Sequence, residues 1–240
     1  MSGHSKWSTI KHKKAATDKK RADIFSKMAK AITVAASLGG GDSQVNYTLR
    51  TEIEKARGLN MPKDRIEAAI GKGVGKDKGG MQLEELLIEC YGPNNSAIIV
   101  KTITDNRNRT TSEIKQILTK NNGKFVGEGG VRWMFEELGV VRADEGQIDN
   151  KEEFEFLAID AGAKDILKEE NFYIIYTDIQ NLQKVENTLE KYGIKNASTG
   201  LEWVAKDKIN LSESEMEKLE KLFNALDENE DVQEIYSNIK

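Results

Sequence analysis

The sequence predicts an α+β protein in which a helical N-terminal part precedes two α/β parts, the last of which is inserted in the one before it. Three observations predict this class. Apolar residues recur at helical spacing up to residue 70, the period changes to that of strands after residue 83, and strands then alternate with helices. The chain has 240 residues, of which 38% are hydrophobic and 32% charged, as is ordinary for a globular protein.

Three helices are expected after a basic N-terminal tail. The first carries apolar residues between positions 24 and 36 and ends at a run of three glycines. The second carries apolar residues between 49 and 56 and stops at Gly58. The third begins at Pro62, because proline is tolerated in the first helical turn. Alternating glycine and lysine from 71 to 80 then indicate a linker.

The next segment reads as a hairpin and a helix. Strands are expected at 83–91 and 97–104, with a Gly-Pro-Asn-Asn turn between them. Thr110 and Glu113 have the spacing of a capping box, which predicts a helix that starts there and runs to residue 122. A further strand is expected from 131 to 135.

From residue 140 the elements follow the order strand, helix, strand, strand, helix, strand, which is the ferredoxin-like pattern. A terminal helix at 214–226 and a strand at 232–236 have no partner in that unit. We therefore expect them to complete the sheet that begins at residue 83. Both α/β domains are expected to be ferredoxin-like, and the predicted domains are 1–78, 79–137 with 207–240, and 138–206.

Charge is distributed unevenly along the chain, whose net charge is −4. Residues 1–30 hold nine basic and two acidic residues, a net charge of +7, whereas the segment from Ser212 onward carries −6. Such asymmetry suggests that one end of the molecule meets a polyanion. The alternative is a solvated surface that happens to be rich in lysine.

Catalysis has little support in the sequence. Both histidines, His4 and His12, lie among lysines that disfavour a bound cation, so no metal site is expected. Cys90 falls in a predicted strand and is expected to be a buried thiol. As the only cysteine it forbids an internal disulfide, and with no apolar span or leader it predicts a cytoplasmic protein. We expect no enzyme activity and no cofactor.

The N-terminal tail is the first candidate nucleic-acid site. Trp7 offers a flat ring beside several lysines, which is what stacking on an unpaired base and neutralising its phosphates require. The alternative is that Trp7 packs back on the first helix. The residues expected to contact nucleic acid here are Lys6, Trp7, Lys11, His12, Lys13, Lys14, Lys19, Lys20 and Arg21.

The second candidate site lies between a predicted strand and a helix N-terminus. It consists of Asn106, Arg107, Asn108 and Arg109, in which two guanidinium groups and two amides border free backbone N–H groups. The alternative is that the asparagines pin a tight loop while the arginines are solvated or paired with acids. Both descriptions can hold together. Trp133 and Trp203 are expected to be core or sheet-face residues.

Five segments carry a resemblance to a known family: GHSKWSTIKHKKAATDKKR, KMAKAITVAASLGGGD, NMPKDRIEAAIGKGVG, YGPNNSAIIVKTITDNRNRT and LDENEDVQEIYSN. They resemble the signature segments of the YebC/PmpR family over nearly the whole chain. The chain departs from the pattern at Val126-Gly127, at Asn94-Asn95 and at Ala205. The first departure weakens any function that rests on the loop from 123 to 130.

The resemblance implies a three-domain, cytoplasmic, non-enzymatic regulator of gene expression. Family members are described as DNA-binding transcriptional regulators. Others are described as ribosome-associated factors that help translation through stretches such as consecutive prolines, so a factor that binds ribosomal RNA is the alternative. We expect a monomer that binds nucleic acid, either DNA or ribosomal RNA on the ribosome, and no membrane.

Overall fold

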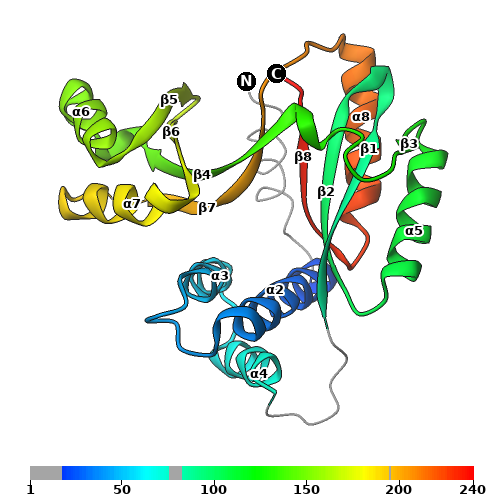
Figure 1. The fold of residues 1–240 in the computed structure, drawn as a ribbon, viewed down its shortest axis with the longest axis horizontal. Coiled ribbons are helices and arrows are strands. Elements are labelled where there is room, and N and C mark those ends of the chain that lie inside the picture. Colours follow the sequence, from blue (N-terminus) through cyan, green and yellow to red (C-terminus); the bar gives the residue numbers. More distant parts are fainter. Residues whose placement is uncertain (1–17, 76–82, 195) are drawn as a thin grey trace. The chain divides into compact units, whose positions relative to one another are not determined.

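The computed structural model describes residues 18–75, 83–194 and 196–240 (Figure 1). Within these ranges the chain forms two compact units. One is Phe135–Lys206, and the other joins the described residues up to Met134 with Asp207–Lys240. The larger unit is therefore discontinuous in sequence, as predicted for the domain that receives the insertion. None of the helices in the described ranges is long and apolar enough to cross a membrane. The finer division into three domains stays a prediction.

The larger unit begins with three helices, α2 (Asp18–Gly39), α3 (Tyr47–Gly58) and α4 (Lys63–Gly73). Asn46 caps α3, because its side-chain oxygen accepts the N–H of Leu49 at 3.0 Å. Ile32, Leu49 and Ala56 are fully buried between the helices. Helix α4 runs three residues into the predicted linker. Its last residue lies so close to α2 that a Cβ on Gly73 would sit 2.4 Å from the carbonyl oxygen of Thr33.

The remainder of the larger unit is a four-stranded antiparallel sheet with two helices. Strands β1 (Glu84–Tyr91) and β2 (Ala97–Thr104) form the predicted hairpin. The order of strands is β3-β1-β2-β8, with β3 (Lys124–Phe125) at one edge and β8 (Val232–Ser237) at the other. The return of the C-terminal strand to this sheet is confirmed, since β8 pairs with β2.

Helices α5 (Arg107–Lys120) and α8 (Glu213–Asp227) cover one face of this sheet. Alternate residues of β1, from Leu86 to Cys90, pack there against Ile114 of α5 and Leu222 of α8. Helix α8 begins with a capping box in which Ser212 and Glu215 satisfy each other's backbone groups.

The smaller unit has the predicted βαββαβ order. It consists of β4 (Phe135–Asp144), α6 (Lys151–Ala161), β5 (Ala163–Glu169), β6 (Phe172–Thr177), α7 (Leu182–Lys191) and β7 (Asn196–Ala205). Its antiparallel sheet has the order β5-β6-β4-β7, which is the ferredoxin-like arrangement. The predicted fold class is confirmed.

Two local predictions are wrong. The capping box at Thr110 and Glu113 does not start α5, which begins at Arg107 and is capped by Asn106. Thr110 lies inside the helix, fully buried. The strand predicted at 131–135 is also wrong, because residues Arg132–Met134 form a short 3-10 helix, η2, and β4 begins only at Phe135.

Candidate nucleic-acid interface

The N-terminal candidates fall largely outside the described part of the chain. Lys6, Trp7, Lys11, His12, Lys13 and Lys14 lie outside the described residues. Lys19 and Lys20 belong to the first turn of α2, and only the backbone of these two residues is described. Arg21 follows them in α2 and is exposed. The structure therefore places the last part of the predicted basic stripe on a helix, and the tail itself stays a prediction.

Two lysines of the basic N-terminal stretch are bound by the acidic C-terminal stretch. Lys27 Nζ donates to the backbone oxygen of Asp227 at 2.6 Å and also to Oδ1 of the same residue at 3.3 Å. Lys30 Nζ donates to Asp231 Oδ1 at 2.6 Å. Part of the basic N-terminal stretch is thus paired with part of the acidic C-terminal stretch. Lys27 and Lys30 therefore contribute less to the binding of any outside partner.

The segment after β2 is built around the cap of α5. Asn106 Oδ1 accepts the N–H of Arg109 at 3.1 Å, and the Asn106 N–H donates to Thr104 Oγ1 at 2.9 Å. The asparagine therefore holds the turn between strand and helix, which is the structural alternative considered for it. Arg107 and Asn108 are exposed in the first turn of α5. Arg107 forms no ion pair with any residue in the described ranges.

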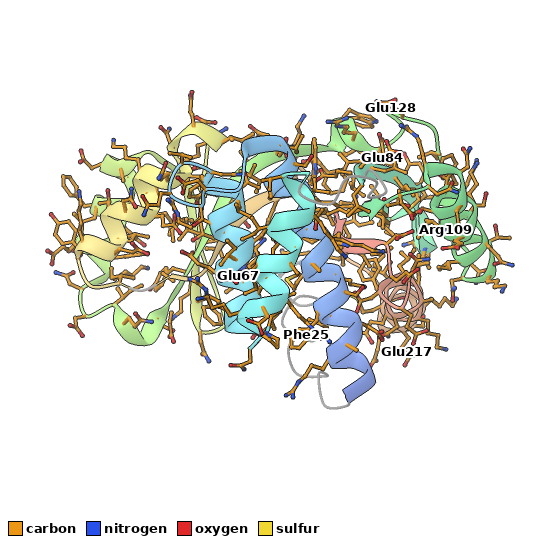
Figure 2. The ribbon with its side chains drawn as sticks, turned by 90° about the horizontal axis from the view of Figure 1, so that it is seen from below. Phe25, Glu67, Glu84, Arg109, Glu128 and Glu217 are labelled. Carbon is orange, nitrogen blue, oxygen red and sulfur yellow. The ribbon has the colours of Figure 1, made fainter. Side chains whose placement is uncertain are left out.

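Arg109, labelled in Figure 2, is held by carboxylates on three sides. Its guanidinium lies 2.8 Å from Asp231, 3.0 Å from Asp105 and 3.9 Å from Glu113. The hydrogen bond to Asp231 raises the pKa of Arg109. The structure thus separates the two arginines of the predicted site: Arg107 faces solvent, while Arg109 is engaged within the protein.

Asp231 is the centre of this arrangement. Its side chain is 0% exposed, and it accepts hydrogen bonds from Lys30 of α2 and from Arg109 and Thr110 of α5. Burial by itself raises the pKa of Asp231, but these three donors outweigh it and hold the pKa at about 2. Sequence reasoning missed this residue, although it lies in one of the five family-like segments. An acidic residue directly before an apolar strand was the available signal.

The structure also reveals a candidate that was predicted to be a core or sheet-face residue. Trp133 is 66% exposed, whereas Trp203 in β7 is 9% exposed and matches its prediction. Trp133 belongs to η2, at the end of a loop that leaves β3. The glycines at 127, 129 and 130 were the signal that this segment is not a strand, because Gly129 has a φ of +81°, which glycine adopts readily.

A buried carboxylate fixes this loop. Glu89 in β1 is 4% exposed and accepts the N–H groups of Gly129, Val131 and Arg132, each at 2.8 Å. Burial by itself raises the pKa of Glu89, but the backbone donors outweigh it and the pKa is lowered. The loop, whose tip residue Glu128 is labelled in Figure 2, is thus tied to the middle of the sheet.

The segment from Arg107 to Met134 is basic. It holds six basic residues, Arg107, Arg109, Lys115, Lys120, Lys124 and Arg132, against Glu113 and Glu128, which gives a net charge of +4 in a protein whose total is −4. All six are exposed, although Arg109 is engaged as described. This segment is a second basic region besides the N-terminal stretch.

The described residues offer little for catalysis. Cys90 is fully buried in β1, and burial raises the pKa of its thiol, which disfavours the reactive thiolate. Within the described ranges, no group of three or more histidine, cysteine, aspartate or glutamate side chains is placed to hold a metal ion.

Two family models together match most of the chain. The model described as the TACO1/YebC N-terminal domain matches residues 5–76, and the model described as the TACO1/YebC second and third domain matches residues 83–239. Among solved structures, a conserved hypothetical protein from Aquifex aeolicus is 38% identical with a TM-score of 0.85, over 95% of this chain and 93% of that one.

Curated relatives cover the full length. A probable transcriptional regulatory protein of Thermoanaerobacter pseudethanolicus is 43% identical over 100% of this chain and 97% of its own. One of Geotalea uraniireducens, with the same description, is 46% identical over 99% of this chain and 95% of its own. With both family models and full-length relatives in agreement, the chain belongs to the YebC/PmpR family.

Proposed function

We propose that this protein is a non-enzymatic regulator of transcription that binds DNA through two basic surfaces. The first is the N-terminal tail with the start of α2, and the second is the segment from Arg107 to Met134. We further propose that it acts in the cytoplasm as a monomer. The relatives' description as transcriptional regulatory proteins supports regulation of gene expression.

The separation of charge is the observation that carries the proposal. Residues 1–30 carry +7 and residues 107–134 carry +4, so the rest of the chain carries −15. A protein with an acidic total that concentrates its cations in two segments attracts a polyanion to those segments and repels it elsewhere. In the second segment Arg107 and Asn108 reach solvent, whereas Asn106 and Arg109 hold the loop in place.

Salt dependence of binding tests the proposal. Affinity for a labelled DNA duplex should fall with salt, with a log–log slope of about −0.9 for each phosphate neutralised. Replacing Lys6, Lys11, Lys13 and Lys14 together by glutamine should flatten the slope by about 3 to 4, because each lysine releases about one counterion. These residues precede α2, so the helix stays intact.

The control replaces four lysines of the smaller unit, Lys151, Lys164, Lys184 and Lys191, by glutamine, which removes the same charge from outside both basic segments. The slope should then stay near that of the natural protein. Equal slopes for the natural protein and the tail variant, or salt-independent binding, would refute the role of the tail. A single-stranded RNA of the same sequence distinguishes the polymers, and a clear preference for RNA would refute DNA as the target.

A further inference from the structure

We propose that Trp133 is a stacking platform for an unpaired nucleobase, and that Arg132 and Lys124 neutralise the neighbouring phosphates. The ligand is a single strand of nucleic acid. This inference rests on the nucleic-acid binding in the proposed function and not on DNA as the polymer, because it assigns part of that binding to a surface at the β3 edge of the sheet. We call this surface the β3-edge surface and define it by Lys124, Arg132 and Trp133.

Exposure of a rigid indole is the first argument. Trp133 is 66% exposed, yet its Nε1–H donates to the carbonyl oxygen of Gly130 at 3.3 Å, so one edge of the ring is held. The residue two positions earlier, Val131, is fully buried and anchors the turn. A large aromatic ring that is fixed in place and open to solvent loses little conformational entropy when a base stacks on it.

The support beneath the ring is the second argument. The Glu89 carboxylate holds three N–H groups of the loop, which fixes the backbone on both sides of Val131. The hydroxyl of Tyr91, also in β1, lies 3.5 Å from the Gly130 oxygen that accepts the indole N–H. Two side chains of one strand thus position the loop, as a preorganised binding site requires.

The exposed cations on the loop and on β3 decide the class of ligand. Arg132 precedes Trp133 and is exposed, and Lys124 on β3 pairs in register with Tyr91. Lys115 of α5 lies 4.2 Å from the centre of the Phe125 ring. Lys124 shares its face of the sheet with Tyr91 and Glu89, which hold the loop, whereas Phe125 and Lys115 lie on the face that packs against the core. Arg132 and Lys124 are therefore the cations on the loop's side of the sheet. An aromatic face among cations matches a base between phosphates better than it matches an apolar protein partner.

A second exposed aromatic residue provides the contrast. Phe156 on α6 is 70% exposed, similar to Trp133, but its helix carries Glu152, Glu153, Glu155 and Asp160. Negative charge at that density repels phosphates. Exposure of an aromatic ring alone therefore does not define the site, which also requires a cation beside the ring, as Arg132 is beside Trp133.

The test measures binding of the full-length protein to three probes of one sequence: single-stranded RNA, single-stranded DNA and the DNA duplex. Trp133→Ala should weaken binding to one or both single strands by about 5- to 100-fold and change duplex binding less than about 2-fold, because stacking needs an unpaired base. Trp133→Phe should recover most of the loss, whereas Trp133→Leu should not. Comparison of the two single strands identifies whether RNA or DNA is the source of the base.

Phe156→Ala is the matched control and should leave binding to all three probes unchanged. Thermal unfolding of each variant excludes loss of the fold, which we do not expect for a side chain this exposed. Quenching of indole fluorescence by the single strand should be smaller in Trp133→Phe than in the natural protein. The inference is overturned if Trp133→Ala binds both single strands as the natural protein does, or if Leu replaces Trp133 as well as Phe does. Failure of the natural protein to bind any probe would instead refute the proposed function.

Discussion

Asp231→Asn removes the charge at the contact between α2, α5 and the start of β8 while it keeps the size of the side chain. The pKa of Asp231 lies at about 2, against an ordinary value of 3.8. Each unit of difference corresponds to about 1.4 kcal/mol, so the carboxylate contributes about 2 kcal/mol to stability at neutral pH. Loss of one partner from a buried pair costs about 3 to 5 kcal/mol. Because Arg109 keeps Asp105 and is 39% exposed, we expect a total of about 2 to 4 kcal/mol.

The pH dependence has a definite sign. A carboxyl group whose folded pKa is depressed stabilises the fold above its unfolded pKa and loses that stabilisation as the pH falls through its folded pKa. The difference in unfolding free energy between the natural protein and Asp231→Asn should be full at neutral pH, shrink below about pH 4 and nearly vanish around pH 2. Urea titrations followed by circular dichroism at several pH values measure this difference.

Hydrogen exchange locates the loss. The Ile103 N–H donates to the backbone oxygen of Asp231 at 2.8 Å, so amides of β2 and β8 should exchange faster in the variant. Amides of β4 and β7, in the smaller unit, serve as the internal reference. Asp227→Asn is the matched control with a smaller expected cost, since Lys27 keeps its hydrogen bond to the Asp227 backbone. A difference that stays the same from neutral pH to pH 2, or unchanged exchange in β2 and β8, would refute the reasoning.

Three further predictions concern residues that hold the larger unit together. Arg109→Gln should lower the unfolding free energy by about 1 to 3 kcal/mol, whereas Arg107→Gln should change it by less than about 0.5 kcal/mol, and equal values in urea titrations would contradict this separation. Glu89→Gln should lower the unfolding free energy by about 1 to 3 kcal/mol, because a neutral amide oxygen accepts weaker hydrogen bonds than a carboxylate. Hydrogen exchange of the Gly129, Val131 and Arg132 amides should become faster, and unchanged exchange would contradict this prediction. Gly73→Ala should lower the unfolding free energy by about 1 to 3 kcal/mol, because the added Cβ clashes with the Thr33 carbonyl oxygen. The control Gly71→Ala, whose Cβ would meet no atom within 4 Å, should be neutral or stabilise the protein by up to about 1 kcal/mol. Thermal unfolding compares the two variants, and a neutral Gly73→Ala would show that α2 and α4 can move apart.

Local sequence patterns predicted most elements because their residues report directly on burial. Strand β2 has the predicted bounds, since its run from Ala97 to Val100 is fully buried and bounded by a turn. The βαββαβ order of the smaller unit was also readable, because each helix there has its own cap or turn signal. The inserted arrangement followed from counting: the last helix and strand had no partner in the unit before them.

The wrong predictions arise where a distant residue overrides the local pattern. Thr110 has the spacing of a cap, but its hydroxyl bonds Asp231, which lies 121 positions further along the chain. The apolar residues around Trp133 resemble a strand, but Glu89 accepts the N–H groups that a strand would offer to its neighbour. Arg109 also has a distant partner, Asp231, which its own segment does not reveal; its predicted contact with nucleic acid stays a prediction.

The inserted unit has a consequence for the order in which the chain can fold during synthesis. Phe135 pairs with Ala205, so the two ends of the insertion lie side by side and the unit can close on itself as soon as it is complete. The second edge of strand β2 is paired later, because its partner there, β8, is synthesised after the insertion. Until then Ile99 and its neighbours lie at an open sheet edge, which is prone to pair with other chains. A chain that ends before residue 231 therefore leaves β2 paired only with β1 and lacks Asp231, the residue that joins α2 and α5.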